Sequence, residues 1–178
     1  MTGTEPAAVG VRLRPPPIAP MAIRPLLPAD RCAYYRFCAQ LSREDLRLRF
    51  AGVMRFNAAL VRRLLAVDPT REAVFAAHGA TGGGSDEILG VARLVRISPE
   101  EAEIALIVRS DRKRRGLGRA LLQRLISHGA ALGLRALIGD VLDENYPARQ
   151  LLGTAGFVGV GLAGTMCRVR LALPGAVH

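Results

Sequence analysis

A basic, glycine-containing segment between a strand-like run and a long amphipathic helix constrains the fold of this chain more than any other feature. Residues 101–108 are strand-like, and residues 116–132 repeat apolar side chains at helical spacing. The sequence RSDRKRRGLGR, residues 109–119, connects the two. A strand, a glycine-containing turn and a helix in this order predict part of an α/β domain.

The same segment is chemically suited to an anion. Glycines let the backbone approach a ligand closely, and the first N–H groups of a helix have no partner within the helix. Six basic residues against Asp111 give the segment a charge of +5, half of the formal net charge of +10 that the whole chain carries. The segment lacks the GxxxxGK[ST] pattern of a P-loop. Two interpretations stay open: a phosphate site, or a solvated basic turn or nucleic-acid patch.

The remaining patterns predict one α/β domain over residues 21–175, preceded by a flexible, proline-rich tail over residues 1–20. Its sheet is predicted to be mixed, because short turns at 81–85 and 98–99 favour antiparallel neighbours. Ser42 and Asp45 resemble a capping box, and Asp30 is predicted to cap an earlier helix. Strands are predicted at 21–27, 73–77, 88–95, 101–108, 134–142 and within 157–173, and helices at 30–40, from 42, 57–67, 116–132 and 146–154.

Composition excludes several classes of protein. The three cysteines have no CxxC spacing, so we expect no disulfide framework, no metal site and a reducing, cytoplasmic setting. No apolar run is long enough to span a membrane, and the N-terminus lacks a secretory signal pattern. Nucleic-acid binding is disfavoured, because the arginines are dispersed and aromatic residues make up only 4% of the chain.

Two motifs give the chain a family resemblance that covers most of residues 22–173. Lys113-x-x-Gly116-x-Gly118 resembles motif A of the GNAT N-acetyltransferases, with Lys at the position where Gln or Arg is usual. Asn145-x-x-Ala148-x-x-Leu151, followed by Gly-Phe, resembles their motif B. The stretches 41–50 and 87–93 look like the acetyltransferase domain of bacterial Pat-type protein lysine acetyltransferases. The resemblance implies a mostly antiparallel mixed sheet with helices on both faces and two splayed central strands.

The resemblance also implies how acetyl-CoA, the expected co-substrate, is bound. The turn would hold the pyrophosphate on backbone N–H groups, and the strand edge 106–108 would pair with the pantetheine arm as an added strand does. Asn145 would contact the pantetheine, although Asn is equally suited to cap the helix that follows it. The donor-binding residues expected on this basis are Leu106, Ile107, Val108, Lys113, Arg114, Arg115, Gly116, Leu117, Gly118, Arg119 and Asn145.

Acetyl transfer to an amine requires a base, because an exposed lysine ammonium has a pKa of about 10.4. Glu103 matches the glutamate that serves as the general base in Pat-like domains, and Asp140 is a second candidate. The alternatives for Glu103 are a solvent-facing edge residue or an ion pair with Arg93. Leu152 stands where many members of the family have a tyrosine acid, so no general acid is assigned. The cysteines lie outside the motifs, which favours direct transfer in a ternary complex.

These observations predict an acetyl-CoA-dependent N-acetyltransferase whose acceptor is a primary amine, either a protein lysine or a small molecule. The alternative is a non-catalytic module that binds acyl-CoA for regulation. A basic peptide acceptor would need a locally acidic groove, which Glu101 and Glu103 are expected to supply. The closing strands 165–173 offer a surface for an oligomer.

Overall fold

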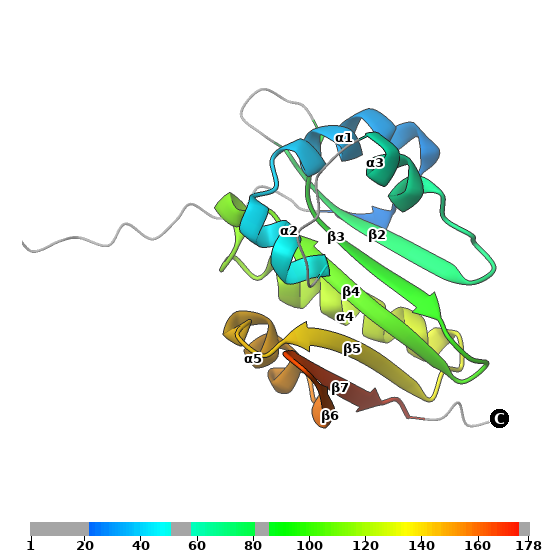
Figure 1. Cartoon of the computed structure of the whole chain (residues 1–178). Helices are drawn as coiled ribbons and strands as arrows, with labels where there is room; N and C mark the ends of the chain where they lie inside the picture. The colour runs from blue at the N-terminus through cyan, green and yellow to red at the C-terminus, as the bar shows by residue number, and fades with distance from the viewer. Residues whose placement is uncertain (1–21, 51–57, 81–85, 175–178) are drawn as a thin grey trace, which may run out of the picture.

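A computed structural model describes residues 22–50, 58–80 and 86–174 (Figure 1). The predicted tail 1–20 and the predicted turn 81–85 lie outside these ranges. The elements in chain order are β1 (Ala22–Pro25), η1 (Pro28–Asp30), α1 (Arg31–Ala39), α2 (Arg43–Phe50), α3 (Ala58–Leu65), β2 (Glu72–Ala80), β3 (Asp86–Arg96), β4 (Glu101–Val108), η2 (Ser110–Arg112), α4 (Leu117–Ala131), β5 (Ala136–Leu142), α5 (Tyr146–Thr154), β6 (Val158–Ala163) and β7 (Met166–Ala172).

The strands form one sheet in the order β1-β2-β3-β4-β5-β7-β6. Every neighbouring pair is antiparallel except β4 and β5, which run parallel because helix α4 connects them. The prediction of a mixed, mostly antiparallel sheet is therefore confirmed.

The two central strands separate along their length. β4 pairs with β5 only from Glu101 to Glu103, opposite residues 136–138. Beyond that point β4 continues to Val108 and β5 to Leu142 without pairing to each other, and the two strands diverge toward α2 and α5 (Figure 1). The splayed strands that the family resemblance implied are present.

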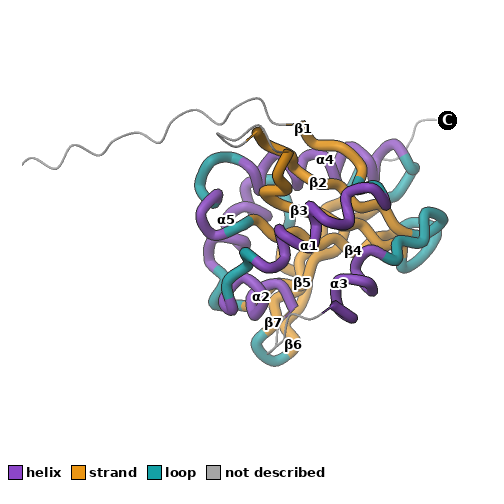
Figure 2. Tube along the Cα trace, turned by 90° about the horizontal axis from the view of Figure 1, so that it is seen from above, coloured by secondary structure: helices purple, strands orange, loops and turns teal. Residues whose placement is uncertain are grey.

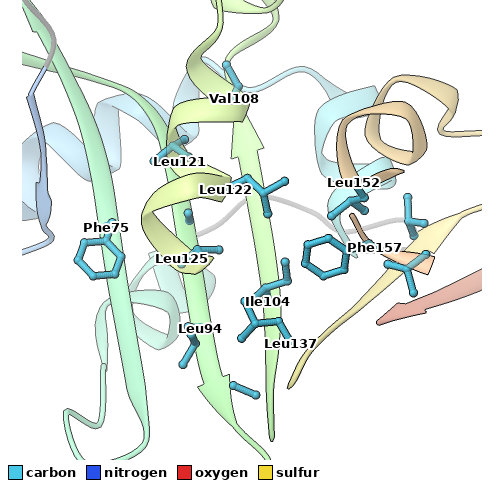
Figure 3. Close-up of a cluster of buried hydrophobic side chains, with 14 of the residues drawn as sticks. Phe75, Leu94, Ile104, Val108, Leu121, Leu122, Leu125, Leu137, Leu152 and Phe157 are labelled. Atoms are coloured by element: carbon cyan, nitrogen blue, oxygen red, sulfur yellow. The ribbon is translucent and has the colours of Figure 1, made fainter. Parts of the chain in front are cut away.

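Helices cover both faces of the sheet, as predicted (Figure 2). The buried leucines of α4 pack on one face against Leu94, Ile104 and Leu137 (Figure 3). Gly90 permits this contact, because a Cβ atom there would lie 2.9 Å from Leu121 Cδ1. Helices α1 and α3 pack on the opposite face, where their apolar side chains form a second core cluster with β2 and β3.

The predicted capping box begins α2. The Ser42 hydroxyl accepts the backbone N–H of Asp45 at 3.0 Å, and the Asp45 carboxylate accepts the backbone N–H of Ser42 at 3.0 Å. Asp30 stands at the predicted N-cap of α1, but its carboxylate accepts hydrogen bonds from Leu27 N and from Arg24 instead. The side chain of Asp30 therefore stabilises the turn that precedes the helix, which corrects the predicted capping role.

Candidate active site

A groove of about 880 Å³ opens where β4 and β5 diverge. The end of β4 and the turn before α4 form one side of it, while α2 and the start of α5 form the others. All predicted donor-binding residues except Arg115 and Leu117 line the groove. The Leu117 side chain is buried in the core, so only its backbone N–H is suited to contact a ligand.

The backbone of the turn is shaped for close approach to a ligand. Gly116 occupies the N-cap position of α4 at φ 84°, a left-handed conformation that favours glycine. Intrahelical hydrogen bonding to this cap starts with the Ala120 N–H, which donates to Gly116 O at 3.0 Å. The N–H groups of residues 117–119 precede it and have no acceptor within the helix. Gly118 serves packing instead, since a Cβ atom there would lie 3.3 Å from Leu151 Cδ2 on α5.

Only part of the charge on this turn is available to a ligand. Arg109 forms ion pairs with Glu87 at 3.1 Å and Asp111 at 2.7 Å. Arg114 and Arg119 line the groove and form no ion pair with any residue of the described ranges. Of the cations on this turn, these two guanidinium groups are therefore best placed to meet an anion in the groove.

Lys113 is held by a carboxylate of α2. Its Nζ donates to Asp45 Oδ1, and Asp45 also accepts the Ser110 hydroxyl at 2.8 Å. Burial would raise the pKa of Asp45, whose side chain is 1% exposed, but the hydrogen bonds from Lys113 and Ser110 hold that pKa below its ordinary value. In this structure Lys113 fastens the turn to α2, although its side chain also borders the groove.

Because Asp45 has a lowered pKa in the folded chain, its ionised form stabilises the fold above the unfolded pKa of about 3.9. That contribution is lost as the pH falls through the lower, folded pKa. We expect Asp45→Asn to be less stable than the wild type at pH 7 and to lose less stability between pH 5 and pH 2. Urea unfolding at several pH values measures both. Parallel curves for the two proteins would contradict the assignment.

The two candidate bases lie on neighbouring strands and on one face of the sheet, because Glu103 pairs with Ile138, two residues before Asp140. Asp140 accepts two hydrogen bonds from Arg168, at 2.8 and 2.7 Å, and these hold its pKa below the ordinary value. A carboxylate held in this way is a poor proton acceptor. Neither candidate lines the groove itself.

Glu103 is exposed at the point where β4 and β5 begin to separate. It forms no hydrogen bond or ion pair with another described residue, so the alternative of an ion pair with Arg93 is wrong. Arg93 pairs instead with Glu72 at 2.5 Å. Glu101 is bound to Arg170 at 3.1 Å, so of the two glutamates that were expected to make the acceptor site acidic, only Glu103 is unpaired within the described ranges.

Asn145 has the predicted capping role, and its position leaves the predicted contact with a ligand open. Its side-chain oxygen accepts the Ala148 N–H at 3.3 Å and so caps α5, while the residue also lines the groove. The amide NH₂ group forms no hydrogen bond within the described part of the chain and stays free to contact a ligand. Leu152 is buried in the core (Figure 3), so its position supplies no general acid.

A small apolar pocket of about 30 Å³ adjoins the groove, and no sequence pattern predicted it. Arg49 and Ile107 line both spaces. Cys38 also lines the small pocket, but burial raises the pKa of its thiol to about 12. The thiol is therefore protonated and weakly nucleophilic at neutral pH.

Known proteins resemble this chain in sequence and fold. The model of the acetyltransferase (GNAT) family matches residues 35–157. Acetyltransferase Pat of Mycolicibacterium smegmatis is 30% identical over 140 residues, which cover 78% of this chain and 41% of that protein. The crystal structure of the GNAT domain of S. lividans PAT is 26% identical with a TM-score of 0.75, covering 85% of this chain and 89% of that chain.

The same fold occurs in a spermidine N-acetyltransferase from Vibrio cholerae, solved in complex with CoA and spermine. That structure is 19% identical with a TM-score of 0.67, and the match covers 85% of this chain and 95% of that chain. The fold and the family match define the enzyme class as N-acetyltransferase. The chain belongs to the GNAT acetyltransferase family, which confirms the resemblance seen in the two motifs. Within the described ranges no helix is long and apolar enough to cross a membrane.

Proposed function

We propose that this chain transfers the acetyl group of acetyl-CoA directly to a primary amine. The observation that carries the proposal is the groove at the splayed strands, which joins an open strand edge to the N-terminus of α4. A long ligand with an amide-containing arm and a pyrophosphate matches both ends of this groove. The family supplies the donor class, because GNAT enzymes use acetyl-CoA.

The donor would lie along the groove with its pyrophosphate at α4. The N–H groups of residues 117–119 and the positive end of the helix dipole attract the phosphates, and Arg114 and Arg119 add charge. The pantetheine amides would pair with residues 106–108, whose edge toward β5 has no strand partner. A backbone N–H of the same strand would then polarise the thioester carbonyl.

Glu103 is our proposed base. It takes a proton from the acceptor ammonium, directly or through water, and the neutral amine then attacks the thioester carbon. A C–N bond forms, the C–S bond breaks, and the CoA thiolate leaves with the electron pair. Asp140 is the weaker candidate, because Arg168 already binds both of its oxygens. The thiolate needs no strong acid, since an ordinary thiol has a pKa of about 8.5.

The acceptor is proposed to be a protein lysine or a small amine. Likeness to Pat favours the lysine, but this chain spans only 41% of the length of that relative. Both classes present the same primary amine to Glu103. The choice between them depends on the chemical groups around the reacting amine.

Arg114→Ala and Arg119→Ala should each raise the KM for acetyl-CoA about tenfold and leave kcat nearly unchanged. A hydrogen bond to a charged group contributes about 1.5–3 kcal/mol, and 1.4 kcal/mol corresponds to a factor of ten in affinity. Steady-state release of CoA thiol measures both constants. Arg124→Ala is the control, because Arg124 is on the same helix but its guanidinium lies over Phe75, away from the groove. An unchanged KM in both variants would show that the phosphates of the donor bind at another place.

A further inference from the structure

Arg49 occupies the junction between the groove and the small apolar pocket, and it lines both. It stands near the C-terminal end of α2, and its guanidinium lies over the Phe50 ring at 4.8 Å from the centroid. Burial lowers the pKa of Arg49 and nearby Arg93 lowers it further, whereas Tyr34 and Glu103 oppose the shift. Arg49 is therefore a partly desolvated cation, and it lines the small pocket together with Ala105 and Ile107 of β4.

No carboxylate in the described ranges forms an ion pair with Arg49. The arginines around it differ in this respect. Arg47 binds Glu44 and Glu144, and Arg93 binds Glu72. Keeping a desolvated guanidinium without a carboxylate partner costs free energy, and such a cost is typical of a site that receives an anion from a ligand.

The phosphates of the donor are not well placed to be that anion. Asp45 fastens the N-terminal part of α2 to the basic turn, where Arg114 and Arg119 lie. Arg49 is four residues further along the helix, a rise of about 6 Å. It contacts the small pocket instead, which is also lined by Ala105 and Ile107, two residues of β4 on the same face of the strand as Glu103. This is the side of the groove on which the acceptor would approach the base.

We propose that Arg49 binds a carboxylate of the acceptor, so that the preferred acceptor is an amine with a carboxylate near the reacting nitrogen. A free amino acid meets this description, and so does a peptide lysine beside an acidic residue. The inference rests on the proposed function: Glu103 receives the ammonium while Arg49 receives the carboxylate. The net charge of +10 favours such acceptors over basic peptides. The pairing of Glu101 with Arg170 weakens the case for a basic peptide further.

Matched acceptors test the proposal. Lysine and 1,5-diaminopentane differ by one carboxylate, and blocked peptides containing Glu-Lys or Gln-Lys differ by one charge. With the wild type, we expect kcat/KM to be about tenfold higher for the acceptor that carries the carboxylate in at least one pair. A single hydrogen bond to a charged group accounts for a factor of this size. Arg49→Gln should abolish the difference, Arg49→Lys should retain part of it, and the KM for acetyl-CoA should not change. The pair that shows the preference identifies the source of the carboxylate.

Several results would overturn the proposal. The proposal would be overturned if the wild type had the same kcat/KM for both acceptors of each pair. It would also be overturned if Arg49→Gln lowered kcat/KM equally for the two acceptors of a pair. A raised KM for acetyl-CoA in Arg49→Gln would assign the side chain to the donor. If no acceptor is acetylated although CoA binds, the proposed function fails, and calorimetric titration of lysine into the CoA complex still decides the role of Arg49. Binding that Arg49→Gln weakens supports the carboxylate contact, and binding that it leaves unchanged overturns it.

Discussion

Replacing Glu103 with glutamine should slow acetyl transfer at pH 7 by about 100-fold, since general-base catalysis contributes about 10²- to 10⁴-fold. The variant keeps the shape of the side chain but cannot accept the proton of the ammonium. Glu103 is exposed and lies outside the groove, so the KM for acetyl-CoA and the thermal stability should not change. The rate of CoA thiol release at saturating amine is the quantity to measure.

The pH dependence of this variant separates a base from a structural residue. Near the pKa of the amine the acceptor is already neutral, so the defect of Glu103→Gln should become smaller as the pH rises. Glu101→Gln is the matched control, because Glu101 is on the same face of β4 but is bound to Arg170. A defect that is constant with pH, or one that Glu101→Gln reproduces, would remove Glu103 from the role of base. A larger loss in Asp140→Asn would transfer that role to Asp140.

Replacing Asp45 with alanine should lower the free energy of unfolding by about 2–3 kcal/mol, because a helix cap and buried, charged hydrogen bonds are lost together. It should also raise the KM for acetyl-CoA several-fold. Without the carboxylate, Ser110 and Lys113 no longer fasten the basic turn to α2. Urea unfolding and the kinetics of CoA release provide the two measurements.

A double-mutant cycle with Lys113→Ala distinguishes the two roles of the lysine. If Lys113 positions the turn through Asp45, each single variant should raise the KM, and the double variant should raise it little more than one of them does. If Lys113 binds the donor directly, Asp45→Ala would free the ammonium and leave the KM unchanged or lower it. If the effects of the two substitutions on the KM added up in the double variant, the positioning role would be contradicted.

Local patterns in the sequence predicted the elements that frame the groove. The bounds of β4 and α5 agree with the expected ranges 101–108 and 146–154, because a turn or a cap marks each start. The Ser42–Asp45 capping box was readable for the same reason, since both partners are three residues apart. The splayed strands had no such local signal. They were expected only from the family resemblance, because the separation of β4 from β5 depends on what packs between them.

Ion pairs between residues that are distant along the chain could not be predicted from the sequence. Asp45 and Lys113 are 68 residues apart, and Asp140 and Arg168 meet only because β5 and β7 are neighbours. The formal charge of the basic turn is therefore larger than the positive charge that is available to a phosphate. The contribution of α2 to the groove was missed as well, since nothing in the spacing of Arg49 places it near β4.

Release of CoA thiol from acetyl-CoA by the unmodified chain, measured with and without a primary amine, tests the central claim most directly. The groove, the free edge of β4 and Glu103 predict release that requires the amine and produces one acetylated amine for each CoA. The mass of the protein should stay unchanged throughout, because transfer is direct. Stabilisation of the chain by CoA with no amine-dependent release would contradict the account and identify a non-catalytic acyl-CoA-binding module instead.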